Sequence, residues 1–223
     1  MSNTQQGSRL VYRNAVKSMI RAGVDPKTAV LSQSYLRFEQ AIVSTKTQYQ
    51  FGVLQNDTGN SNVAVRPTEQ RLALQDSFYC GSIQIMLGLA TSANDTAFPL
   101  YTYASPTLFL TGKYTNYYNL WNSNLSLSVN NRKIATAWDC LRHYQVNQTQ
   151  QTAVNPLAGA GILSQFNGAE DGVAECEPNW VLIGSKNNQL QINLNNAIDP
   201  ATAFTYIVVV MRGVLAQNVT VVS

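Results

Sequence analysis

The alternation of apolar and polar residues predicts one long strand near the middle of the chain. From residue 78 onward the side chains divide into two alternating sets, which are Phe78, Cys80, Ser82, Gln84 and Met86 on one side and Tyr79, Gly81, Ile83, Ile85 and Leu87 on the other. This period of two is typical of a β-strand. We therefore expect residues 72–90 to form the central strand, and the β-branched run at residues 206–215 to pair with it or pack near it.

Shorter segments of similar character predict the rest of a β domain. The expected strands are residues 45–55, 107–111, 125–129, 134–138, 141–146, 180–184, 189–194 and 219–222. Asn130 and Asn131 are expected to form a hairpin turn, and residues 35–43 fit either a short helix or a strand. About nine or ten strands without a repeated βαβ pattern predict a mainly β fold, an antiparallel sandwich.

The N-terminal region has a helical pattern. Ser8 can cap a helix over residues 9–22, and Gly23 is expected to end it. Apolar and small residues line one side: Val11, Ala15, Ser18, Met19 and Ala22. Basic residues recur at every fourth position along another side, as Arg9, Arg13, Lys17 and Arg21. We therefore divide the chain into a basic helical arm, residues 1–27, and a β body, residues 28–223, with a weakly patterned insertion at residues 147–178.

The charge of the chain is low and unevenly placed. Charged residues make up 12% of the 223 residues, and hydrophobic residues make up 45%. The net charge is +3, yet residues 1–27 carry five basic residues and one acidic residue, which gives 5 − 1 = +4 and leaves 10 − 11 = −1 for the remainder. A polar surface with few charges suits a subunit that lies against other subunits. The basic arm suits contact with nucleic acid phosphates or with anionic lipid head groups.

The cysteines and the N-terminal residues indicate the cellular compartment in which the chain folds. Cys80, Cys140 and Cys176 are widely spaced and odd in number, which disfavours a zinc site or a disulfide framework and fits a reducing compartment. No apolar segment follows Met1, so no signal peptide is expected. No run of about 18 apolar residues predicts a spanning helix.

Asp139, Cys140 and His143 are the first candidates for chemistry, because a cysteine, a histidine and a carboxylate can form a nucleophilic site. On a strand, however, Cys140 and His143 would point to opposite faces. An ordinary strand with a polar edge is the preferred interpretation. A hydrolase that uses Asp139 and His143 is kept as a third functional hypothesis, while no recognised catalytic motif is present and a non-enzymatic role is expected.

Two further clusters are candidate contact sites. The acidic residues Glu170, Asp171, Glu175 and Glu177 lie in one segment, and their oxygens could bind Ca²⁺ at a subunit boundary or pair with the basic arm. A solvated acidic loop is the simpler interpretation, and no cofactor is otherwise expected. The aromatic residues Tyr114, Tyr117, Tyr118 and Trp121 could stack on sugars or bases, although packing in the core or between subunits is the preferred interpretation.

Several stretches resemble a known family. Residues 69–79 (EQRLALQDSFY), followed by the long strand, resemble the coat proteins of small tailless bacteriophages with jelly-roll shells. Residues 124–131 (NLSLSVNN), 144–150 (YQVNQTQ) and 189–194 (QLQINL) with 204–215 have a similar character. The resemblance implies a jelly-roll sandwich and a structural role in an icosahedral shell, in some members over an internal membrane. A single jelly roll fits the strand count better, and a compact double jelly roll is the alternative.

We therefore expect a virion capsid subunit that is assembled in the host cytoplasm. Its partners would be copies of itself in a trimeric or larger capsomer, other virion proteins, and genome phosphates or lipid head groups through the arm, with no small-molecule substrate. The alternative is a carbohydrate- or receptor-binding β-sandwich, such as a spike or lectin module, in which the aromatic cluster would be the contact site.

Overall fold

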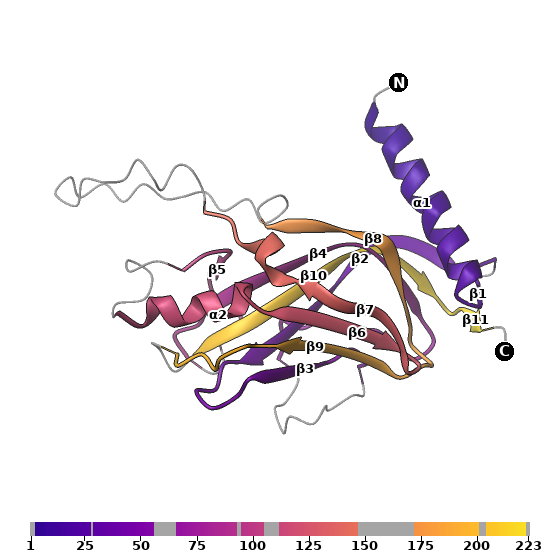
Figure 1. The fold of residues 1–223 in the computed structure, drawn as a ribbon. Helices are drawn as coiled ribbons and strands as arrows, with labels where there is room; N and C mark the ends of the chain where they lie inside the picture. Colours follow the sequence, from indigo (N-terminus) through magenta and orange to yellow (C-terminus); the bar gives the residue numbers. More distant parts are fainter. Residues whose placement is uncertain are drawn as a thin grey trace.

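The computed structural model describes residues 3–27, 29–55, 66–92, 95–104, 112–146, 172–200 and 204–221. It is mainly β, with two antiparallel sheets and an N-terminal helix, as the sequence predicted (Figure 1). The helical elements are α1 (Asn3–Arg21), η1 (Gly112–Tyr117), α2 (Tyr118–Trp121) and η2 (Cys140–His143).

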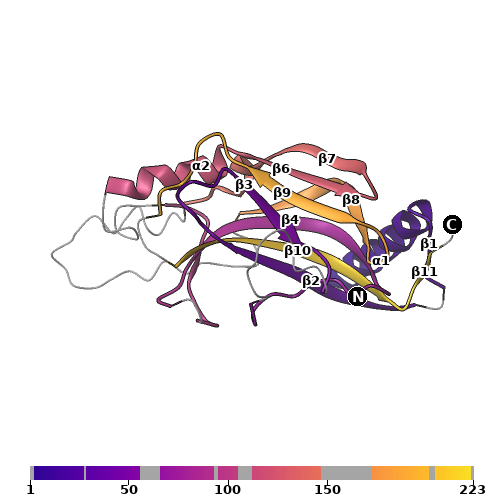
Figure 2. The ribbon, with the colours of Figure 1, turned by 90° about the horizontal axis from the view of Figure 1, so that it is seen from below.

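The two sheets lie face to face as the layers of a sandwich (Figure 2). The larger sheet contains β2 (Val30–Ala41), β10 (Thr205–Gln217) and β4 (Ser77–Leu89), with β8 (Val173–Ile183) and β5 (Leu100–Tyr101) both paired to β4. The smaller sheet has the order β3 (Gln48–Gly52), β9 (Asn188–Asn193), β6 (Asn124–Val129) and β7 (Arg132–Asp139). A short pair, β1 (Val24–Asp25) with β11 (Thr220–Val221), joins the end of the arm to the end of the described chain.

The pairing of the long strands is nested along the sequence. The antiparallel pairs are β2 with β10, β3 with β9, β4 with β8, and β6 with β7, so the first long strand pairs with the last and the middle two pair with each other. Two further pairings, β10 with β4 and β9 with β6, join these pairs into the two sheets. Of the two arrangements predicted for residues 206–215, pairing with the central strand is the one observed.

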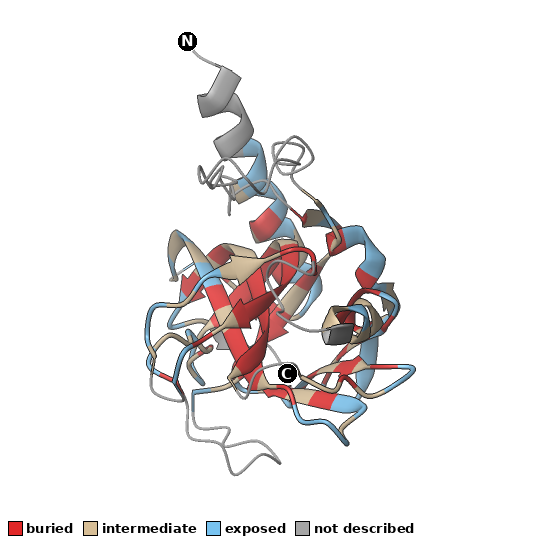
Figure 3. Cartoon of the chain, turned by 90° about the vertical axis from the view of Figure 1, so that its left-hand side faces the viewer, coloured by how far each residue is buried: buried red, intermediate tan, exposed pale blue. Residues whose placement is uncertain are grey.

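The main core fills the space between the sheets (Figure 3). Phe38, Phe78 and Ile207 enter it from the larger sheet, and Phe51 and Leu190 enter it from the smaller sheet, all of them buried. The described residues form this one sandwich, and they contain no second sandwich of the kind that the double alternative requires.

The regular alternation predicted for the central strand is wrong at its middle, because β4 contains a bulge at Gly81. The register with β10 passes from Arg212↔Ser82 to Gly213↔Cys80, which leaves Gly81 unpaired. One extra residue reverses the faces of all residues that follow it. Phe78 and Cys80 therefore share the core with Ile83, Ile85 and Leu87, while Ser82, Gln84 and Met86 lie on the outer face.

Other boundaries also differ from the prediction. Residues 35–41 are strand, within β2, and residues 42–43 lie beyond its end. Residues 141–146 are not a strand: η2 begins at Cys140 because the Asp139 side chain accepts a hydrogen bond from Leu141 N at 2.9 Å, which diverts the backbone from a ladder. The end of the expected insertion belongs to β8, and residues 147–171 lie outside the described residues, as does the strand expected at 107–111. Helix α1 begins at Asn3, before the cap predicted at Ser8, and β4 begins at Ser77 instead of residue 72.

Candidate interaction surface around the N-terminal helix

Helix α1 is attached to the body through its C-terminal half. Ala15 and Met19 are fully buried on the outer face of the larger sheet, in a second cluster with Tyr79, Val214 and Ala216. Gly23, with φ of 82°, ends the helix where the sequence predicted, since this left-handed conformation favours glycine.

Three apolar residues of α1 face solvent. Leu10, Val11 and Ile20 are 59%, 42% and 56% exposed, and the helix extends away from the sandwich (Figure 1). Of the apolar side predicted from the sequence, Ala15 and Met19 dock on the sheet, whereas Val11 remains exposed. Large exposed apolar side chains on a projecting helix indicate a surface for a partner.

The predicted cationic stripe is present along the described part of α1. Arg13, Lys17 and Arg21 are exposed, and none of them forms an ion pair with a described residue. Arg9 belongs to α1, but its side chain lies outside the described residues. The stripe therefore keeps its charge available to a partner.

Three more basic residues join the end of this stripe in a groove of about 630 Å³ between α1, the β6–β7 hairpin and β8. We call it the basic groove. Its charged lining residues are Arg21, Arg132, Lys133 and Lys186, and none of the described residues that line it is acidic. In Figures 1 and 2 the hairpin and the C-terminal end of α1 lie at the same end of the sandwich. The sequence did not predict that Arg132, Lys133 and Lys186 contribute to this surface, because only long-range strand pairing brings them to Arg21.

The turns that carry these cations are linked to each other. Asn130 and Asn131 have φ of 51° and 62°, as in the two-residue turn predicted from the sequence. Asn130 N donates to Asn187 O at 2.7 Å, which ties the hairpin to the β8–β9 connection. The buried Asn188 donates through Nδ2 to Lys186 O at 2.7 Å and to Ile183 O at 2.8 Å. The backbone that presents Arg132, Lys133 and Lys186 is therefore held in one geometry.

A second groove, of about 880 Å³, lies on the outer face of the larger sheet beside the N-terminal half of α1. We call it the mixed groove, because Arg37 and Arg212 line it together with Glu175 and Glu177. Arg212 Nη1 donates to the buried Gln84 Oε1 at 2.9 Å, and burial lowers the pKa of Arg212. The mixed groove carries both signs of charge, in contrast to the basic groove.

The predicted acidic segment is only partly described. Glu175 and Glu177 are exposed on β8, while Glu170 and Asp171 lie outside the described residues. Where the chain is described, no three His, Cys, Asp or Glu side chains gather in a group that could hold a metal ion. Calcium binding at a subunit boundary stays a prediction.

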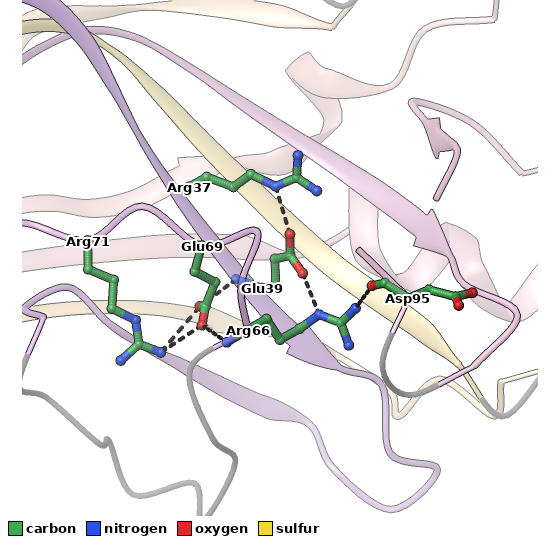
Figure 4. A network of polar contacts seen from close by, with 6 residues as sticks. All are labelled: Arg37, Glu39, Arg66, Glu69, Arg71 and Asp95. Atoms are coloured by element: carbon green, nitrogen blue, oxygen red, sulfur yellow. Dashed lines mark hydrogen bonds and ion pairs between the residues drawn. The ribbon is translucent and has the colours of Figure 1, made fainter. Parts of the chain in front are cut away.

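Buried ion pairs connect β2 to the segment that precedes β4 (Figure 4). The Glu39 carboxylate, which is buried, accepts from Arg37 Nε at 2.7 Å. Its other oxygen lies 2.7 Å from Arg66 Nε, as an ion pair without hydrogen-bond geometry, and Arg66 also donates to Asp95 O. The Arg66 guanidinium lies 4.2 Å from the ring centroid of Tyr206, which is the second residue of β10. The ion-paired Arg66 therefore covers the beginning of that strand.

Glu69 fixes the same segment through its side chain. Its carboxylate accepts from Glu39 N at 3.0 Å, from Arg66 N at 2.9 Å and from Arg71 Nη2 at 3.1 Å. Gln70 and Arg37 also exchange backbone hydrogen bonds at 2.9 and 3.0 Å. Glu69 and Gln70 thus hold the connection into β4 against the edge of β2.

The ring nitrogens of His143 bond to groups other than Asp139 and Cys140. His143 is buried, and its Nδ1 lies 2.8 Å from Gly172 O while Trp138 Nε1 donates to its Nε2 at 2.9 Å. Because a carbonyl only accepts and an indole N–H only donates, Nδ1 carries the proton. Burial lowers the pKa of His143 to about 4 and raises the pKa of the Cys140 thiol to about 11. Both ring nitrogens are engaged in holding the fold.

The aromatic cluster packs in the core, in agreement with the preferred interpretation. Tyr117 and Trp121 are buried, and Tyr114 and Tyr118 are partly buried against the main core. Trp121 and Tyr144 meet edge to face with centroids 5.1 Å apart. The rings that the carbohydrate-binding alternative requires are therefore not presented as a stacking surface.

The three cysteines are free and buried. Cys80 Sγ and Cys176 Sγ lie 3.7 Å apart across the β4–β8 pair, where burial raises the pKa of Cys80 well above its ordinary value. These thiols are inert packing groups under this burial.

Comparison of the chain with protein-family models, curated proteins and solved structures found no match. Within the described residues, no helix is both long enough and apolar enough to cross a bilayer.

Proposed function

We propose that the chain is a structural subunit of an icosahedral viral capsid, which assembles through its β body and carries a basic N-terminal helix on the interior side. The observation that carries the proposal is the nested order of the eight long strands. Numbered one to eight along the chain, they form sheets of order 1-8-3-6 and 2-7-4-5. This order is the one expected of a single jelly roll, a fold used by viral coat proteins and by lectins.

The fold alone does not choose between these uses, because one fold serves many functions. The lectin or receptor-binding alternative rested on the aromatic cluster, and Tyr117 and Trp121 are buried. The capsid proposal draws support from features outside the core: a projecting helix with exposed apolar and basic residues, and a surface with few charges. Both features are expected of a subunit that contacts copies of itself and an anionic interior.

The edge of β2 offers one contact for assembly. On its side away from β10, the backbone of β2 pairs with the described residues only at the isolated bridge between Arg37 and Gln70. Val30 and Tyr35, on the part of the strand before that bridge, are 64% and 50% exposed. An edge strand with exposed apolar residues is prone to pair with another chain.

The proposal is tested by the assembly state of the purified full chain. Size-exclusion chromatography with light scattering, followed by electron microscopy, should show defined oligomers and closed particles as protein concentration and salt are varied. A chain that stays monomeric under all these conditions would contradict the capsid role.

A matched pair of variants examines the β2 edge. Val30→Lys should lower the assembled fraction about tenfold or more, because each copy would place a charge at the contact. Leu141→Lys replaces a residue of similar exposure, 53%, on η2 and should assemble normally. Normal assembly of Val30→Lys would place the contact elsewhere on the subunit.

A further inference from the structure

We propose that the basic groove binds the sugar–phosphate backbone of a single-stranded nucleic acid. This inference deepens the proposed function, since it assigns the genome contact to a built site on the body as well as to the helix. The groove brings together Arg21 of α1, Arg132 and Lys133 of β7, and Lys186 of the β8–β9 connection. Four cations converge there from three elements, and no carboxylate of the described part of the chain lines the groove.

The cations are available for a ligand. None of the four forms an ion pair or a side-chain hydrogen bond with a described residue. By contrast, Arg37 and Arg66 are paired with the buried Glu39. Glu39 thus neutralises charge at Arg37 and Arg66, whereas no described carboxylate pairs with the cations of the basic groove. Like charges held close together repel one another, and a bound polyanion removes that repulsion.

The site is also held in place before binding. The hydrogen bond from Asn130 N to Asn187 O fixes the hairpin against the β8–β9 connection, and the burial of Met19 fixes the helix end that carries Arg21. A preorganised set of donors loses less conformational freedom on binding than flexible side chains on separate loops.

The shape and lining favour a nucleic acid strand over other anions. The cations line a concave groove, which admits a strand, whereas a planar bilayer surface contacts projecting residues such as Leu10 and Ile20. The lining residues that the structure describes include no aromatic residue. Without a ring for a base to stack on, recognition would depend on phosphates and be independent of sequence.

The expected affinity of one copy is modest and strongly dependent on salt. Each neutralised phosphate of a single strand contributes about −0.7 to the slope of log K against log salt, so four contacts give a slope of about −3. Many copies on one shell would add their contacts through multivalency.

The test measures binding of a fluorescein-labelled oligo(dT) of about 20 nucleotides to the full chain by anisotropy, between about 50 and 200 mM salt. The variant Arg132→Glu with Lys133→Glu should weaken binding about tenfold or more and reduce the slope to about −1. The control Lys46→Glu with Arg142→Glu changes the net charge equally at residues outside both grooves and should retain most of the affinity. Circular dichroism should show both variants folded.

The outcomes separate this inference from its alternatives. Absence of oligonucleotide binding by the unmodified chain, or equal losses in the two double variants, would overturn the groove as a nucleic acid site. If the groove variant instead loses flotation with vesicles of phosphatidylcholine and phosphatidylglycerol while the oligonucleotide fails to bind, the site recognises a membrane and the inference is wrong. Particles without oligonucleotide binding contradict the groove alone, and binding by a permanent monomer contradicts the capsid role alone.

Discussion

At the scale of single residues, the only histidine shows how position in the fold decides chemistry. Its two ring nitrogens bond to Gly172 O and Trp138 Nε1. Burial disfavours the imidazolium form, which lowers the pKa of His143 to about 4, below its ordinary value of 6.5. A residue that looks catalytic in sequence is thus a buried structural link between η2, β7 and the start of β8.

This lowered pKa predicts a loss of stability in mild acid. Between about pH 6.5 and 4 the unfolded chain binds a proton at His143 that the folded chain does not. The stability of the folded chain that depends on a neutral His143 is therefore complete above pH 6.5 and declines as the pH falls. From about pH 7 to 4.5 the free energy of unfolding should fall by about 2 to 3 kcal/mol from this group. Urea denaturation of the unmodified chain and of His143→Gln should differ in pH dependence by that amount, and identical pH profiles would contradict the assignment.

At the scale of elements, the bulge in β4 decides which residues reach the core. It allows β10 to keep an unbroken alternation while β4 changes face at Gly81. The strands come so close there that a Cβ at Gly213 would lie 1.8 Å from Tyr79 O. At Gly81 the nearest atom is 3.8 Å away. The two glycines therefore have different roles: Gly213 permits the close approach, and Gly81 is the extra residue.

A pair of alanine variants distinguishes these roles. Gly213→Ala should lower the free energy of unfolding by about 3 kcal/mol or more, because a side chain there overlaps the backbone of β4. Gly81→Ala should change it by less than about 1 kcal/mol, since the new methyl group has ordinary van der Waals space. Chemical denaturation of both variants provides the measurement, and equal losses would show that the bulge is not built as described.

At the scale of the whole molecule, the chain consists of a body with its own core and a helix that docks on it. Among the described side chains, none from α1 belongs to the main core, and the helix contributes Ala15 and Met19 to the second cluster. This separation supports the division into arm and body. The pairing of β1 with β11, however, ties residues 24–25 to the body, so the attachment of the arm extends beyond the helix.

Deletion of residues 1–23 should therefore leave a folded body. The free energy of unfolding should fall by about 2 to 3 kcal/mol, because Tyr79 and Val214 lose their cover, while unfolding remains cooperative. Particle formation or the content of the particles should be impaired. An unfolded body, or particles with normal content, would contradict this division of roles.

Local signals were enough to predict several elements. The helix and its end at Gly23, the Asn130–Asn131 turn and the two longest strands depend on periodicity and turn chemistry, which neighbouring residues determine. The basic groove could not be predicted in this way. Arg21, Arg132 and Lys186 are far apart in the chain, and only the docking of α1 and the pairing of β6 with β7 and β9 bring them together.

The sequence by itself determined a mainly β chain with a basic N-terminal helix, because hydrophobic period and charge spacing act over a few residues. Only the tertiary structure decided the faces of β4, the burial of Tyr117 and Trp121, and the role of His143. The physical reason is that face, burial and partner depend on register and on long-range packing. A single unpaired residue such as Gly81 is sufficient to reverse them.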